Sequence, residues 1–151
     1  MRRSPYILLM FDDLYNTDIL TLSASLKNER LDGPDGKARK VSKLCGSWLE
    51  IDVNMDGDVV SEVALRVQAC ALGQSSAAIL QQGIIDASLL EIIEARDALR
   101  EMLKEEGEAP KGRFEKLALL KGVKAYPARH MSTLLAFEAA AEAVEQALQN
   151  A

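Results

Sequence analysis

The 151-residue chain is poor in the residue types that most often carry enzyme chemistry, with two cysteines, one histidine and one tryptophan. A single histidine disfavours a serine-type catalytic triad, because Ser75 and Ser76 have no histidine near them in sequence. The segment Gly33-Pro34-Asp35-Gly36 lacks the Lys-Ser/Thr pair that follows in a phosphate-binding loop. We therefore expect neither a hydrolase site nor a nucleotide site.

Long apolar runs are also missing. The stretch Tyr6–Phe11 is too short for a signal peptide and ends at Asp12 and Asp13, and no run is long enough to span a bilayer. We expect no membrane partner and a cytoplasmic location, in which thiols stay reduced. Cys45 and Cys70 are then available as ligands for a metal or for sulfur, although burial as small apolar side chains is a common alternative.

No sign of charge dominates any region, since 18 basic and 23 acidic residues give a net charge of −5 and are spread along the chain. The absence of a basic stripe argues against nucleic-acid binding. The densest basic stretch, Lys37–Lys43, is interpreted as a solvated loop that leads into Cys45. The length predicts one domain, residues 1–151, which can bury a core without disulfides.

Two stretches alternate between apolar and polar residues and predict β-strands, Trp48–Val53 and Glu62–Gln68. Helical spacing, capping signals and glycine stops predict five helical segments. They are Leu14–Leu26, Ala71–Gly83 with a glycine C-cap, Ser88–Gly107 with a Ser88/Glu91 capping box, Phe114–Leu120, and a final helix from Arg129 to Leu148. The expected fold class is α+β, a small antiparallel sheet with helices packed on one face.

The two predicted strands form a hairpin around Asp56-Gly57, where glycine supplies the positive φ of a tight turn. Folding about Gly57 pairs Leu49 with Leu65 and aligns the apolar faces. The same register sets Cys45 beside Ala69, one residue from Cys70. The two thiols are therefore expected to lie close together at one end of the sheet.

Cys70 comes at the start of a predicted helix, where unpaired N–H groups and the helix dipole favour the thiolate form. The only histidine, His130, also comes near the start of a predicted helix. A lone histidine is more often a surface or core residue than a metal ligand. Further evidence is therefore needed before His130 is counted as a ligand.

Three segments supply that evidence: Cys45-Gly46 before the hairpin, Ala69–Ser76 (ACALGQSS) at a helix start, and Gly122–His130 (GVKAYPARH) before an alanine-rich helix. In this order they resemble the U-type iron–sulfur cluster assembly scaffolds, which are IscU, SufU and the N-terminal domain of NifU. The match runs from about residue 44 to 144. The VKAYPAR string and the insert Glu105–Lys121 resemble the SufU branch in particular.

The chain departs from the family pattern at two ligand positions. Ser47 stands where the family has the aspartate of Cys-Gly-Asp, and the third cysteine is missing. An ungapped alignment puts Ser132 at the third cysteine, whereas a shift by one residue aligns His130 with the family histidine and Met131 with that cysteine. The resemblance implies Cys45, Cys70 and His130 as ligands, with Ser47, Met131 and Ser132 as further candidates.

Two thiolates and an imidazole make a three-ligand site with an open fourth position, which suits zinc or iron more than a tightly held cluster. The resemblance implies a carrier rather than an enzyme, which binds iron, zinc or a transient [2Fe–2S] cluster. Its partners would be a cysteine desulfurase, an iron donor and apo-protein acceptors. The alternatives are a sulfur-acceptor partner of the desulfurase, or a degenerate interaction protein that binds no metal.

Overall fold

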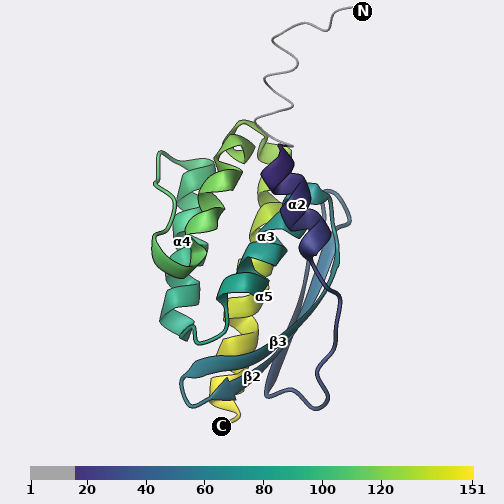
Figure 1. Ribbon diagram of the computed structural model, residues 1–151, viewed down its shortest axis with the longest axis vertical. Helices are drawn as coiled ribbons and strands as arrows, with labels where there is room; N and C mark the ends of the chain where they lie inside the picture. The colour runs from purple at the N-terminus through teal and green to yellow at the C-terminus, as the bar shows by residue number, and fades with distance from the viewer. Residues whose placement is uncertain (1–15) are drawn as a thin grey trace, which may run out of the picture.

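The computed structural model describes residues 16–151, so that Leu14, with which the first expected helix begins, and the stretch Tyr6–Phe11 lie outside the described residues. An N-terminal helix is followed by a three-stranded sheet and then by helices (Figure 1). The elements are α2 (Thr17–Ser25), β1 (Gly36–Val41), β2 (Trp48–Asp56), β3 (Val59–Gln68), α3 (Ala71–Gly83), α4 (Leu89–Lys104), the 3₁₀ segments η1 (Gly112–Ala125) and η2 (Pro127–Arg129), and α5 (His130–Gln149).

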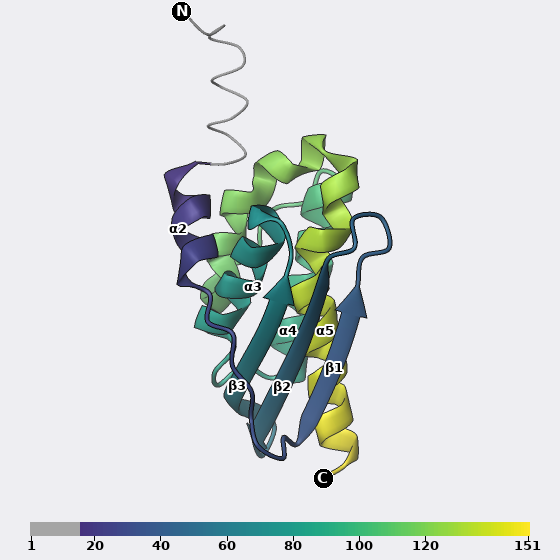
Figure 2. The ribbon, with the colours of Figure 1, turned by 90° about the vertical axis from the view of Figure 1, so that its right-hand side faces the viewer.

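The sheet has the order β1-β2-β3, with both neighbouring pairs antiparallel. Helix α5 packs on β1 and β2 and also contacts α3 and α4, while α2 packs on α3. Figure 2 shows the strands in front and the helices behind them, so that none of the helices within residues 16–151 covers the other sheet face. The α+β architecture with helices on one sheet face is therefore confirmed.

Small residues let α5 lie close to the sheet. A Cβ atom on Gly36 would come within 2.1 Å of the carbonyl oxygen of Ala143 and 2.8 Å of the Ala147 methyl group. Only glycine fits at this contact between β1 and α5. The apolar faces of β2 and α5 meet in the core, where Leu49, Ile51 and Phe137 are at most 1% exposed.

The hairpin forms between the expected strands, but its register differs from the prediction by two residues. Leu65 pairs with Ile51 rather than with Leu49, which pairs with Val67. The turn is closed by the pair Asp56–Val59, and a bulge at Asn54/Met55 inserts an extra residue into β3. A shift of two residues keeps every side chain on its face, so the buried apolar set is unchanged.

The structure corrects the interpretation of Lys37–Lys43 as a solvated loop, because most of this stretch belongs to strand β1. This edge strand alternates between exposed Lys37 and Arg39 and the more buried Gly36 and Ala38. Charged outward residues on an edge strand protect it from pairing with other chains. Because the inward residues are glycine and alanine, the apolar alternation that marks a strand in sequence was too weak to detect.

Helix α3 runs over the expected residues, but Gly83 is not its C-cap. The last helical residue is Gly83 itself, and Ile84 follows in a right-handed conformation. Gly83 is required by packing, since a Cβ there would lie 2.7 Å from the Arg113 carbonyl oxygen and 3.0 Å from the Phe114 ring. The Ser88/Glu91 capping box at α4 is confirmed.

Two other helix bounds differ from expectation. Helix α4 ends at Lys104 rather than at Gly107, and the expected short helix at Phe114–Leu120 is a longer 3₁₀ segment, η1. The final helix begins at His130, next to the expected start at Arg129. Between Asn16 and Ala151, no helix combines the length and the hydropathy that crossing a bilayer would need.

Candidate functional site

The two cysteines line one hollow of about 300 Å³ at the end of the sheet, together with Ser47, Gln68 and Arg129. Cys45 lies in the loop between β1 and β2, and Cys70 lies two residues after the end of β3. Figure 2 shows that this loop and the end of β3 lie at the same end of the sheet. The thiols thus converge, although the β1–β2 loop rather than the predicted β2–β3 register carries Cys45 there.

The loop that carries Cys45 is held by its own backbone. The Ser42 N–H donates to the Ser47 carbonyl at 2.8 Å, and the Gly46 N–H donates to the Ser42 carbonyl at 2.9 Å. Gly46 adopts a φ of 72°, a conformation that favours glycine. Cys45 is exposed at the tip of this closed loop, whereas Ser42 and Ser47 are buried.

The Cys45 sulfur is in contact with two hydroxyl groups. Its Sγ lies 3.4 Å from Ser42 Oγ and 3.0 Å from Ser47 Oγ. Hydrogen bonding to Ser42, then to the side chain and backbone of Ser47, lowers the pKa of Cys45 from its ordinary value, and the positive charge of Arg129 adds to this effect. This arrangement favours the thiolate, which is the form that binds metals and attacks sulfur.

Cys70 is the N-cap residue of α3, and its sulfur lies 3.5 Å from the hydroxyl of Ser132 on α5. Ser132 is 1% exposed, whereas Met131 is 38% exposed. A Cβ on Gly73 would come within 3.2 Å of the Ser132 carbonyl oxygen, so the first turns of α3 and α5 pack closely. Of the two candidates for the missing third cysteine, Ser132 is the one whose side chain reaches Cys70.

His130 is 7% exposed and points its Nε2 at two backbone carbonyl groups. The Nε2 atom lies 3.1 Å from the Val123 oxygen and 3.2 Å from the Lys124 oxygen. Carbonyl oxygens only accept hydrogen bonds, so Nε2 is the donor to both. The imidazole therefore bonds to the end of η1 in this structure.

Within residues 16–151, no three side chains of histidine, cysteine, aspartate and glutamate lie close enough together to hold a metal ion. The structure brings Cys45 and Cys70 to one hollow but does not add His130 to them. Serine hydroxyls accompany each thiol, and hydroxyl oxygen is a harder and weaker zinc donor than thiolate or imidazole. Among the described residues, the hollow therefore holds two thiols and no third histidine, cysteine, aspartate or glutamate side chain within reach of a shared ion.

A second hollow of about 510 Å³ adjoins Cys45 and is lined by Leu44 and residues 125–129. Leu44 is 70% exposed and Val41 is 48% exposed. Sequence reasoning did not single out Ser42 or Arg129 as members of the site. The signals were present, since Ser42 comes three residues before Cys45, and Arg129 is part of the VKAYPAR string.

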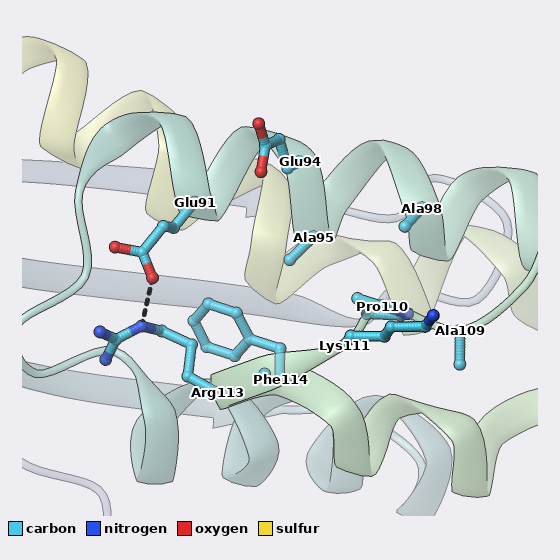
Figure 3. A pocket seen from close by; sticks show the side chains of 10 residues that line it. Glu91, Glu94, Ala95, Ala98, Ala109, Pro110, Lys111, Arg113 and Phe114 are labelled. Atoms are coloured by element: carbon cyan, nitrogen blue, oxygen red, sulfur yellow. Dashed lines mark hydrogen bonds and ion pairs between the residues drawn. The ribbon is translucent and has the colours of Figure 1, made fainter.

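The most voluminous hollow described, about 530 Å³, lies away from both cysteines between α4 and the start of η1. In Figure 3, Glu91 from α4 and Arg113 from η1 form an ion pair across it, and the Phe114 ring lies between them and the alanine side chains of α4. It contains no thiol or histidine. We therefore place the candidate site at the cysteines.

Comparisons with known proteins agree with the sequence resemblance, although no family model matches the chain. The crystal structure of a nitrogen-fixing NifU-like protein (N-terminal) from Brucella abortus is 42% identical, with 94% of this chain and 99% of that chain covered and a TM-score of 0.90. A SUF-system scaffold structure, SufU from Fervidobacterium islandicum, has a TM-score of 0.79 over 88% of this chain and 98% of that chain at 21% identity, which shows the shared fold.

Two curated relatives are named iron–sulfur cluster assembly scaffold protein IscU. The protein from Thermotoga maritima is 24% identical over 91% of this chain and 97% of its own length. The protein from Streptococcus pyogenes is also 24% identical, over 68% of this chain, and the match spans only 64% of that relative's length.

Proposed function

This chain belongs to the IscU/NifU-like family of iron–sulfur cluster assembly scaffolds, and we propose that Cys45 and Cys70 together carry its cargo. The observation that carries the proposal is that both thiols line one hollow. Thiolate is a common protein ligand for zinc and the usual one for iron–sulfur clusters. The cargo is an iron or zinc ion, or a transient [2Fe–2S] cluster. The protein acts as a carrier and not as an enzyme, in the cytoplasm, where thiols stay reduced.

The open coordination around the two sulfurs limits how tightly a cargo is held. Ser47 and Ser132 are the nearest oxygen donors to Cys45 and Cys70 respectively. His130 as a third ligand stays a prediction, with Nδ1 as the nitrogen that would bind because Nε2 donates to carbonyl groups. A weakly held cargo fits a protein that takes up a cluster and passes it on.

A second candidate function is sulfur acceptance from a cysteine desulfurase, and the surroundings of Cys45 favour it. Cys45 is exposed, and two hydroxyl groups favour its thiolate. That thiolate would attack the outer sulfur of the persulfide on the desulfurase. A new S–S bond would form at Cys45, the S–S bond on the enzyme would break, and the enzyme cysteine would leave as thiolate.

The partners implied by this proposal are a cysteine desulfurase, an iron donor and apo-protein acceptors. The second hollow beside Cys45, with exposed Leu44 at its edge and Arg129 in its wall, gives such a partner an apolar and basic surface next to the thiol. Apolar contact with an adjacent charge is typical of surfaces that bind other proteins.

The test is zinc binding by anaerobically prepared protein in competition with a chromogenic chelator, for wild type, Cys45→Ala and Cys70→Ala. We expect one zinc in wild type and a loss of at least about tenfold in affinity for each variant, because each loses one of two thiolates. Ser61→Ala, at an exposed position of β3 outside the candidate ligand set, is the control. Equal zinc binding by all four proteins would contradict the two-cysteine site.

The sulfur-acceptance alternative has its own measurement. The metal-free protein is incubated with a cysteine desulfurase and free cysteine, and each cysteine peptide is examined by mass spectrometry for the added mass of one sulfur atom. We expect the added sulfur on Cys45. If neither zinc nor sulfur is bound, the chain is the degenerate interaction protein of the third alternative.

A further inference from the structure

We infer that His130 is a positioning residue, which holds residues 125–129 against the cysteine site by bonding its imidazole to the end of η1. The hydrogen bonds of His130 stand by themselves, and only their effect on a cysteine cargo site rests on the proposed function. It assigns the single histidine a task that differs from binding the cargo.

The hydrogen bonds of His130 close a short loop. Its Nε2 donates to the carbonyl groups of Val123 and Lys124, and residues 125–129 are the whole of the chain between these acceptors and His130 itself. Inside the loop, the Arg129 N–H donates to the Tyr126 carbonyl at 2.9 Å. The His130 side chain thus joins the C-terminal end of residues 125–129, where it is attached, to their N-terminal end at Lys124.

This closed loop is the wall of the site. Residues 125–129 line the second hollow together with Leu44 and Cys45, and Arg129 also lines the hollow that the two cysteines share. The charge of Arg129 acts on the Cys45 thiol. A change in the position of the loop therefore changes both the shape of the site and the charge beside Cys45.

Burial fixes the imidazole in this role. His130 is 7% exposed, and the two carbonyl groups it reaches belong to the last turn of η1, where the Val123 carbonyl also accepts from the Tyr126 N–H at 2.9 Å. Without the imidazole, the Lys124 carbonyl would lose the donor that His130 gives it, and the Val123 carbonyl would keep only its bond from Tyr126, which weakens the hold on the segment. The same helix turn also holds Thr133, whose hydroxyl donates to the Arg129 carbonyl at 2.8 Å.

The test compares two amide substitutions that differ by one methylene group. The terminal nitrogen of glutamine reaches the position of Nε2 in histidine, whereas that of asparagine is too short. In metal-free protein, hydrogen–deuterium exchange is measured on the peptide that contains residues 125–129, with an α4 peptide as the control for global folding. We expect His130→Asn to speed exchange roughly fivefold to tenfold, as loss of a hydrogen bond predicts, and His130→Gln to stay near wild type.

Zinc competition on the same three proteins separates a positioning role from a ligand role. We expect His130→Asn to weaken zinc binding and His130→Gln to restore it, although glutamine is a poor zinc ligand. If both variants lose zinc affinity while the exchange of His130→Gln stays at the wild-type level, His130 is a ligand and the inference is overturned. A lower melting temperature in His130→Asn with unchanged exchange at residues 125–129 would overturn it as well.

Failure of the proposed function gives a different pattern. If wild type binds no zinc, the metal cargo is refuted, and exchange still decides the positioning role. The rate at which Cys45 is alkylated in the metal-free variants then reports the effect on the site. A slower rate in His130→Asn that His130→Gln restores supports the inference, and equal rates in all three proteins contradict it.

Discussion

At the residue level, each cysteine has a serine hydroxyl beside it. Ser47 Oγ is 3.0 Å from Cys45 Sγ, and Ser132 Oγ is 3.5 Å from Cys70 Sγ. The family resemblance places Ser47 at the position of the aspartate, and its ungapped alignment places Ser132 at that of the third cysteine. The substitutions keep polar contact with sulfur but remove a negative charge, so the site attracts cations less strongly than a site with a carboxylate and a third thiolate.

The hydroxyl contacts of Cys45 predict the behaviour of Ser42→Ala and Ser47→Ala. The pKa of Cys45 is lowered chiefly by Ser42 and then by Ser47, so either substitution raises this pKa toward its ordinary value and leaves less thiolate at neutral pH. We expect alkylation of Cys45 at pH 7 to slow by roughly threefold to tenfold. The rate is followed from pH 6 to about 10 by mass spectrometry of the Cys45 peptide.

Ser61→Ala, on an exposed position of β3, is the control for that experiment. If the pH profile of Cys45 alkylation is the same in both hydroxyl variants as in wild type, the two serines only pack against the sulfur. The enhanced reactivity expected for Cys70 from its place at a helix start stays a prediction, and its peptide is followed in the same samples.

The place of Ser132 predicts which cysteine substitution completes the site. Ser132→Cys puts a thiol next to Cys70 and should tighten zinc binding by at least about tenfold, because a third thiolate fills an open position. Met131→Cys puts its thiol on the exposed side of α5 and should leave the zinc affinity unchanged. Chelator competition on both variants checks this, and tighter binding by Met131→Cys alone would favour the shifted alignment.

At the level of elements, the contact between β1 and α5 depends on small residues. Gly36 faces Ala143 and Ala147, where a Cβ atom would come far inside van der Waals distance. Two polar interactions also join β1 to α5. The Lys37 N–H donates to the Gln146 side chain at 2.8 Å, and Lys40 forms an ion pair with Glu142. The edge strand thus lies on the helix through backbone contact rather than through large apolar side chains.

Gly36→Ala should therefore destabilise the protein by about 1–3 kcal/mol, the usual cost of forcing extra atoms into a packed contact. Lys37→Ala, one residue away on the exposed side of β1, should change the free energy of unfolding little. Urea denaturation of both variants gives this quantity directly. Equal stability of Gly36→Ala and wild type would mean that β1 moves away from α5 without cost.

Across the whole molecule, a charged network ties the segment after α2 to the outer face of the sheet. The Arg66 guanidinium donates to both oxygens of Asp52, at 2.9 and 3.0 Å, and to the Glu29 carbonyl at 2.8 Å. The Leu31 N–H donates to Asp52 at 3.1 Å. Burial raises the pKa of Asp52, but the hydrogen bonds from Arg66 and Leu31 outweigh it and hold this pKa below its ordinary value of 3.8.

This lowered pKa predicts a loss of stability in acid. Because the pKa of Asp52 is lower in the folded protein than in the unfolded chain, its contribution is complete above the unfolded value and is lost as pH falls through the folded value. Asp52→Asn should lower the free energy of unfolding at pH 7 by on the order of 2 kcal/mol, since Arg66 loses one of its two carboxylate partners.

The difference between Asp52→Asn and wild type should shrink as pH falls from about 4 to 2, where wild type loses the same interaction. Urea midpoints at several pH values measure it. Glu106→Gln is the control, because Glu106 pairs with Lys124 at a side chain that is 96% exposed and should contribute little. A difference that stays constant with pH would assign the effect of Asp52→Asn to packing.

Local signals in the sequence determined most of the elements. The Ser88/Glu91 capping box fixed the start of α4, because both hydrogen bonds of that motif form within four residues. Apolar alternation identified β2 and β3, and the cysteine-containing segments identified the family. Each of these features depends on neighbours in the chain, so it is readable without knowledge of the fold.

Other features were decided only by contacts between distant segments. The two-residue turn Gly57-Asp58 and a bulge at Asn54/Met55 together set the hairpin register. Gly36–Val41 became a strand by pairing with β2 while it packs on α5. The partners of the site residues also come from afar, since Ser132 meets Cys70 across 62 positions in the chain. The His130 imidazole donates to the carbonyl groups of Val123 and Lys124 at the end of η1, a contact that no pattern in the sequence indicated. The sequence alone identified the two thiols, whereas the hydroxyl groups that contact them became known only from the tertiary structure, because folding brings these groups together.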